Sequence, residues 1–472
     1  MKWDRAELAA WLLVALCVGG FAWFILANGA FNNDDLDNFI TVRSGNIWRL
    51  MIMPMTGGHW SPFHRLSTWF VYWIAPMRFG AAVAVLIVFH IAALVYLQAT
   101  LRLLGLKVAD KVILCMYASC ALLIYGMIWW ANAQLRIPHV LFCAAAIFHY
   151  IAWLKGGSRR HLWLAAAAYL LDMLVYQKAV LVPVYMLVFG YLSEPARFHD
   201  KPVANASLPA ALLAVSAVFT VAFKYLSPPQ LYTPGIGNVV HIEWQFLTAL
   251  SSGLIGLMVD NVKDLGSAYV VQQHCATLIV VLALLAVTLW ASPRTWKLWI
   301  AMLGVLVLDY LPVSTSSRFL FGALAPYSYR YHFEPVYLIA LFAGLFCLQI
   351  SQDRKGLQGT TFAKVLPAAV VVIYLGVNIA SLAHARENSV AIANSRRAHG
   401  YMGNLQDGMA RIQEPDPTFA DSEVPRYMHI MVGPDRTAQI VPLFIPGARF
   451  TSAGDARYQV SNSGEVVVLP PP

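Results

Sequence analysis

Charge is scarce in this sequence. Only 12% of the 472 residues are Asp, Glu, Lys or Arg, which is about half the share that is usual in soluble domains. The mean hydropathy is high, at +0.60, and 59% of the residues are of hydrophobic types. These values exclude an intrinsically disordered chain, a coiled coil and an ordinary soluble enzyme, and they predict a helical protein that crosses a membrane many times.

Cysteine is also sparse, with six residues in the chain. None of them forms a Cys-x-x-Cys pair or the Cys/His spacing of a metal site, so they are predicted to be small core residues. The net charge is +9, but the Lys and Arg residues gather in short clusters between apolar runs. Membrane topology explains that pattern, and no nucleic-acid partner is expected.

Long apolar runs are what the sequence has in abundance. A spanning helix needs about 20 apolar residues, and the sequence offers eleven candidates. They are 8–28, 79–101, 112–130, 137–154, 161–177, 178–192, 207–226, 275–291, 297–313, 333–350 and 365–383. We therefore predict an all-α polytopic membrane domain over residues 1–383. The fifth and sixth segments almost adjoin, so 161–192 is either two spans or one broken pair.

The basic residues predict the orientation of these spans. One set of alternate loops carries 15 Lys and Arg, whereas the other and longer set carries 8. Cytoplasmic loops are the ones enriched in Lys and Arg, so the amino terminus is predicted to be cytoplasmic and the first helix a retained anchor. The loop 29–78 and the tail 384–472 are then extracytoplasmic, and a bacterial inner membrane is the expected location.

The tail has a different composition, with no Lys and with scattered Pro and Gly. Three short runs favour strands: Tyr427–Val432, Ile440–Ile445 and Glu465–Leu469. The tail is long enough to fold by itself. It is predicted to be a small α+β extracytoplasmic domain.

The first external loop, 29–78, contains the richest chemistry. Asp34, Asp35 and Asp37 follow the first helix closely. Carboxylates this close together, beside a low-dielectric membrane, raise at least one pKa, which suits a general base for an acceptor hydroxyl. Such a cluster could also bind Mg²⁺ or Mn²⁺. The alternative is a solvated acidic stretch that caps a short helix.

Aromatic and basic residues follow in the same loop. His59 and Trp60 could bind a sugar, and His64 and Arg65 could donate hydrogen bonds to a phosphate. The alternative is an interfacial aromatic belt with snorkelling Arg.

Two further cations lie far along the chain. Lys178 is in very apolar surroundings, where a cation usually has a partner or a function. It either pairs with Asp172 or contacts a phosphate. Arg330, followed by Tyr331, lies at the start of the tenth predicted span and either grips an anionic headgroup or anchors the helix in the interface.

Taken together, these residues resemble the GT-C superfamily of membrane glycosyltransferases, which includes the protein O-mannosyltransferases and the aminoarabinose transferases. Asp34-Asp35 matches the acidic pair that follows helix one in that family. The segment 58–65 is similar to its aromatic, Arg-Pro-type motif but has Ser-Pro instead, and Arg330-Tyr331 matches its late Arg-Tyr. At Gln177-Lys178 the family's acidic neighbour is missing.

The resemblance implies a sugar donor on a polyprenyl phosphate and an acceptor glycan, lipid or protein on the outer face, with inversion at the anomeric carbon. Asp34 or Asp35 would be the base. Lys178, Arg330, Arg65 and His64 would contact the donor phosphate, and His59, Trp60 and Tyr331 the sugar or acceptor. No cofactor is certain, although some members need a divalent metal.

Two other functions remain open from the sequence. A transporter or flippase of lipid-linked sugars would also need cations and aromatics, but usually on broken helices near the bilayer midplane. An O-antigen ligase or polymerase usually has its large external loop late in the chain, whereas here the early loop is the rich one.

Overall fold

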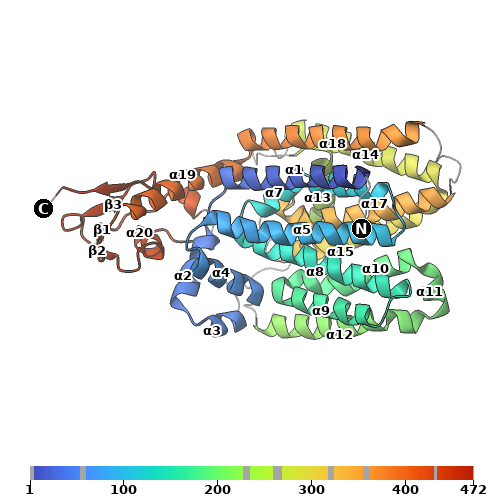
Figure 1. The fold of residues 1–472 in the computed structure, drawn as a ribbon, viewed down its shortest axis with the longest axis horizontal. Coiled ribbons are helices and arrows are strands. Elements are labelled where there is room, and N and C mark those ends of the chain that lie inside the picture. Colours follow the sequence, from blue (N-terminus) through green and yellow to red (C-terminus); the bar gives the residue numbers. More distant parts are fainter. Residues whose placement is uncertain are drawn as a thin grey trace.

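The computed structural model describes residues 5–53, 60–226, 234–258, 268–316, 324–353, 361–429 and 433–470. Most of the chain forms a bundle of helices, from which a small domain extends at one end (Figure 1). The helices of the bundle and its loops are α1 (Arg5–Asn28), α2 (Asp34–Ser44), α3 (Ile47–Ile52), α4 (Pro62–Ile74), α5 (Phe79–Leu103), α6 (Ala109–Ala118), α7 (Leu122–Met127), α8 (Trp130–Leu154), α9 (Arg160–Val175), α10 (Val182–Ser193), α11 (Pro195–Asp200), α12 (Pro202–Leu226), α13 (Ile236–Leu254), α14 (Ala268–Ala291), α15 (Trp296–Ser314), α16 (Leu324–Tyr327), α17 (Phe333–Asp353) and α18 (Thr361–Asn388). Three 3₁₀ turns connect them: η1 (Gln177–Leu181), η3 (Pro293–Thr295) and η5 (Tyr329–His332).

The prediction of a polytopic helical membrane protein is confirmed. Within the described residues, eight helices are long and apolar enough to cross a membrane. They correspond to eight of the eleven predicted spans. The other three segments form shorter helices: 112–130 becomes α6 and α7, 161–177 becomes α9, and 178–192 becomes η1 and α10.

The break between α6 and α7 has an identifiable cause. The backbone N–H of Ala121 donates to the side-chain oxygen of Asn378, on α18, at 2.7 Å. A helix N-terminus leaves such N–H groups without partners inside the helix, so this contact stabilises a new helix start. Sequence periodicity does not reveal it, because Asn378 is far away in the chain.

The core of the bundle is α8. In the most apolar stretch of this helix, 78% of the residues are buried, the highest value among the eight candidate spans. It packs against α5, α9 and α10. A helix that is apolar around its whole circumference and buried by protein is expected at the centre of a large bundle.

The carboxyl-terminal part is a small α+β domain, as predicted. It consists of α19 (Val390–Ala410), β1 (Thr418–Ala420), η6 (Arg426–Met428), α20 (Thr437–Ile440), η7 (Val441–Leu443), β2 (Arg449–Thr451), β3 (Tyr458–Val460) and β4 (Val466–Val468). The strand order is β2-β1-β3-β4; β1 pairs in parallel with β2 and β3, and β3 is antiparallel to β4.

The strand predictions for this domain were only partly right. Glu465–Leu469 contains β4, but Ile440–Ile445 is helical, in α20 and η7. Arg436 and Gln439 form a capping box at the start of α20, and Pro442 cannot donate to a strand ladder. The run Tyr427–Val432 includes part of η6, and its residues 430–432 lie outside the described residues.

Candidate active site

The acidic pair lies in the turn that joins α1 to α2. α1 ends at Asn28, and α2 begins at Asp34, so Asp34 and Asp35 occupy the first turn of a helix. The partial positive charge of a helix N-terminus stabilises carboxylates there. Figure 1 shows α2–α4 at the same end of the bundle as the carboxyl-terminal domain.

The carboxyl-terminal domain holds this turn in place. Asn33 has a φ of 48°, a left-handed conformation that Asn tolerates better than most residues. Its backbone N–H donates to the carbonyl of Met428 at 2.7 Å. Gly433 packs against the same peptide, and a Cβ at Gly433 would lie 2.6 Å from the carbonyl oxygen of Asn33. Residues from the two ends of the chain therefore build one turn.

Asp35 is a structural carboxylate. It is fully buried, and its two oxygens accept hydrogen bonds from the backbone N–H of Asn32 at 3.1 Å and of Ala131 at 2.6 Å. Ala131 is in the first turn of α8, so Asp35 satisfies an N–H that the helix cannot pair itself. Burial, reinforced by the charge of Asp34, raises the pKa of Asp35 well above its ordinary value. With no exposed oxygen, Asp35 cannot reach an acceptor.

Asp34 is only half-buried and faces other partners. The indole Nε1 of Trp129 donates to its Oδ1 at 2.8 Å. Burial raises the pKa of Asp34 to about 6, while the Trp129 hydrogen bond and the charge of Arg330 oppose that rise. The carboxyl is therefore mostly ionised at neutral pH yet basic enough to accept a proton, which is what a general base requires.

Arg330 lies beside the same indole. Its guanidinium carbon is 4.6 Å from the centroid of the Trp129 ring and 5.0 Å from that of Tyr331. One guanidinium nitrogen donates to the Tyr331 hydroxyl at 3.2 Å. Stacking on two rings fixes the guanidinium through cation–π attraction. Arg330 takes part in no ion pair between described residues, and its half-buried position leaves it able to bind an anion.

Lys178 has a different partner from the one considered above. Its Nζ lies 2.6 Å from a carboxylate oxygen of Asp309 and 3.8 Å from one of Glu334. Asp172 pairs instead with His139, at 2.8 Å. Lys178 is almost completely buried, and the extended backbone of Tyr176 separates η1 from α9.

A buried ion pair connects Lys178 to the region of Arg330. Arg136, on α8, donates to both oxygens of Glu334, at 2.6 and 2.7 Å. The guanidinium of Arg136 also lies 5.2 Å from the centroid of the Tyr331 ring. Contacts therefore run without interruption from Lys178 through Glu334, Arg136 and Tyr331 to Arg330. Buried charges survive only when paired in this way.

The sequence could have identified two of the residues that it was not used to predict. Arg136 and Glu334 stand in apolar stretches, where an ionisable residue is a functional-site candidate by default. Trp129 carried no such signal, because its role depends on the start of α8 meeting the start of α2.

His64 and Arg65 lie in α4. Arg65 donates to the side-chain oxygen of Asn38 at 3.0 Å, and the Nε2 of His64 lies 3.3 Å from the side-chain nitrogen of Gln134. Both side chains are at most 5% exposed. Burial lowers the pKa of Arg65, and the charge of Asp37 opposes that change. Their present contacts join α4 to α2 and α8.

The residues expected to bind sugar or acceptor are dispersed. The Trp60 ring packs against Phe219 of α12, with centroids 5.6 Å apart. The hydroxyl of Ser61 donates to the carbonyl of Val175 at the end of α9, at 2.6 Å. Tyr331 is buried between two guanidinium groups, and His59 lies outside the described residues.

The described part of the chain contains no group of three or more His, Cys, Asp or Glu residues arranged as a metal site. Oxygens of both Asp34 and Asp35 already accept N–H donors.

Comparison with known proteins gives a distant structural likeness. No protein-family model and no curated protein matches the chain. Among solved structures, the chain is similar to ArnT from Cupriavidus metallidurans, in a crystal structure with bound undecaprenyl phosphate. The two share 13% identity and a TM-score of 0.42, over 96% of this chain and 87% of that one. At that identity and score the likeness assigns no family.

Proposed function

We propose that this protein is a membrane glycosyltransferase of the GT-C type, which moves a sugar from a polyprenyl-phosphate donor to an acceptor on the extracytoplasmic face. The observation that carries the proposal is the cluster of Asp34, Trp129 and Arg330. It places a carboxylate with a raised pKa at the N–H edge of the Trp129 indole and a guanidinium over the face of the same ring. A base and an anion-binding group side by side are what the reaction needs.

The reaction follows from the positions of these groups. The acceptor hydroxyl oxygen attacks the anomeric carbon of the donor sugar, and Asp34 takes the hydroxyl proton. The bond from the anomeric carbon to the phosphate oxygen breaks, and its electron pair leaves with the polyprenyl phosphate. Attack opposite the leaving group inverts the anomeric centre. Arg330 stabilises the charge that develops on the phosphate.

The other predicted residues take supporting positions in this proposal. Asp35 fixes the turn that carries Asp34. Lys178 can contact the donor phosphate only if its ion pairs with Asp309 and Glu334 break. Arg65 and His64 hold α4 against α2 and α8. Trp60, His59 and Tyr331 remain proposed contacts of the sugar or acceptor.

The orientation is part of the proposal. In Figure 1 the acidic turn and the carboxyl-terminal domain are at one end of the bundle, and α11 is at the other. The connections rich in Lys and Arg include Lys155, Arg197 and Lys201, around α11. By the positive-inside rule we assign that end to the cytoplasm, and we propose that the acidic turn lies on the outer face of a bacterial inner membrane.

The test is transfer activity in membranes supplied with donor lipid extracted from the host's own envelope. Asp34→Asn keeps the shape of the side chain but removes the base, and we expect transfer to fall about 10²–10⁴-fold. Asp200→Asn, at an exposed position in α11, is the matched control and should transfer at the wild-type rate. Wild-type transfer by Asp34→Asn would refute the assignment of the base.

The same membrane preparation can distinguish a glycosyltransferase from a flippase. A flippase would move a fluorescent polyprenyl-phosphate sugar across vesicles without releasing polyprenyl phosphate. For the proposed enzyme we expect release of polyprenyl phosphate that requires acceptor, and translocation no faster than in vesicles without the protein.

A further inference from the structure

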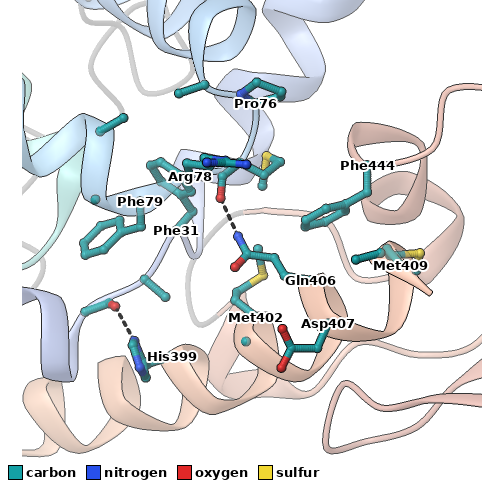
Figure 2. A pocket seen from close by; sticks show the side chains of 18 of the residues that line it. Phe31, Pro76, Arg78, Phe79, His399, Met402, Gln406, Asp407, Met409 and Phe444 are labelled. Atoms are coloured by element: carbon teal, nitrogen blue, oxygen red, sulfur yellow. Dashed lines mark hydrogen bonds between the residues drawn. The ribbon is translucent and has the colours of Figure 1, made fainter. Parts of the chain in front are cut away.

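A second candidate binding site lies between the helix bundle and the carboxyl-terminal domain. A cavity of about 1080 Å³ separates the helix bundle from the carboxyl-terminal domain. One wall is the end of α1 and residues 75–81, before and at the start of α5; the other is α19 with Phe444 and Ile445. Figure 2 shows these side chains around the open space. The volume is at the upper end of the range for small-molecule sites.

The cavity is distinct from the proposed catalytic site. Phe31 lines it and packs edge-on against Phe39 and Trp130, with ring centroids 4.7 and 5.2 Å apart. Phe39 and Trp130 are themselves stacked at 5.2 Å. Neither Phe39 nor Trp130 lines the cavity, and neither do Asp34 and Asp35.

Two opposite charges line this space on different walls. Arg78 comes from the bundle wall and Asp407 from α19, and Figure 2 shows them on different sides of the cavity. Both side chains are exposed, and neither takes part in an ion pair between described residues.

The neighbouring polar residues have structural roles. Gln406 donates to the carbonyl of Met77 at 2.5 Å, and the ring Nδ1 of His399 is 2.9 Å from the carbonyl oxygen of Gly29. These contacts fasten α19 to the bundle across the cavity. Arg78 and Asp407 are therefore the two charged groups of the lining that such contacts leave for a ligand.

The bundle wall continues into exposed apolar surface on two of the candidate membrane spans. Leu26, which lines the cavity, is 41% exposed, and Trp23, one turn below it on the same face of α1, is 65% exposed. On α5, Gly80 lines the cavity, and Ala84 and Val88 follow it at helical spacing on the exposed face. Both helices are long and apolar enough to cross a membrane. An apolar stripe thus runs from the cavity along the two helices, which favours a lipid over a water-soluble ligand.

We propose that this cavity binds the headgroup of a zwitterionic phospholipid that has a primary amine, with the phosphate at Arg78 and the ammonium at Asp407. The guanidinium provides paired donors for phosphate oxygens, and the carboxylate accepts from the ammonium. The acyl chains extend along Leu26 and Gly80 into the bilayer. The lipid fills the junction between the bundle and the carboxyl-terminal domain.

The test uses the full-length protein, stripped of lipid in detergent and incubated with equimolar phosphatidylethanolamine and phosphatidylglycerol. Native mass spectrometry then counts bound lipid. We expect wild type to retain phosphatidylethanolamine at least fivefold over phosphatidylglycerol. Asp407→Asn should abolish that preference, and Arg78→Ala should lower retention of both lipids. The matched controls are Arg49→Ala and Asp435→Asn, at exposed positions outside the lining.

A steric variant provides an independent check. A Cβ at Gly403 would meet no atom within 4 Å, although the residue lines the cavity. Gly403→Leu should therefore fill the space, keep the thermal midpoint of unfolding and lose the bound lipid. Equal retention of the two lipids by wild type, or the wild-type profile in all three variants, would overturn the proposal by showing that only non-specific lipid is bound.

Discussion

The indole N–H of Trp129 donates to the carboxylate of Asp34 over 2.8 Å, and this bond lowers the pKa of Asp34 against the effect of burial. Trp129→Phe removes the donor but keeps most of the ring. The apparent pKa of the acid limb of the transfer rate should then rise by about one unit, because a hydrogen bond to a charged group has been lost. Rates measured between pH 5 and 8 would show the shift. Trp163→Phe, on the exposed surface of α9, should leave the profile unchanged.

If Asp34 is the proposed base, the transfer rate of the wild-type protein should depend on pH in a defined direction. Asp34 has a pKa of about 6, and only its ionised form can accept the acceptor's proton. The transfer rate should therefore be level above that pH and fall about tenfold per unit below it. A profile that stays flat down to pH 5 would show that no carboxyl with this pKa limits the reaction.

Asp35 and Asp34 should respond differently to substitution. Asp35→Ala leaves the N–H groups of Asn32 and Ala131 buried without acceptors, which should lower the free energy of unfolding by about 2–4 kcal/mol. Thermal unfolding in detergent measures the loss as a lower midpoint. Asp34→Asn should instead keep the wild-type midpoint and lose transfer. Equal midpoints for Asp35→Ala and wild type would contradict the structural role.

The buried pair of Arg136 and Glu334 should show strong coupling. Glu334→Gln leaves the buried Arg136 guanidinium without its counter-charge, so it should destabilise the protein by about 3–5 kcal/mol. Replacing both residues with Met should recover most of that stability, because no unpaired charge remains. The double variant should nevertheless transfer poorly, since the Tyr331 ring that holds Arg330 loses its own support. A double-mutant cycle on unfolding midpoints, run beside transfer rates, separates the two effects.

Gly433 provides a test of the contact between the domains. It has a φ of +126°, and a Cβ there would lie 2.6 Å from the carbonyl oxygen of Asn33. Gly433→Ala should therefore push the carboxyl-terminal domain away from the acidic turn and lower both the transfer rate and the unfolding midpoint. Gly454→Ala, where a Cβ meets nothing within 4 Å, is the matched control and should behave as wild type.

Sequence reasoning located the membrane spans and the acidic turn because both depend on local composition. A run of apolar residues, or three carboxylates after a helix, is visible without knowing what packs against it. The break in 112–130 was not visible, because it depends on Asn378. The pairing of Lys178 with Asp309 depends in the same way on residues 131 positions apart.

In the carboxyl-terminal domain, the strand predictions failed because the structure depends on more than local strand propensity. Ile440–Ile445 is rich in residues that favour strands, yet a capping box at Arg436 starts a helix there. β1, β2 and β3 have only three residues each, too few for the alternation of apolar and polar residues to identify them.

The hydrogen bond from Asn33 to Met428 also determines when the site can exist. A ribosome makes the acidic turn among the first residues and the segment that closes it among the last. Until the tail has been synthesised and has folded against the bundle, the loop after α1 lacks the partner that sets its backbone. Under the proposed function, a truncated or half-made chain would occupy the membrane with the Asp34 base out of position, and it would not consume donor lipid.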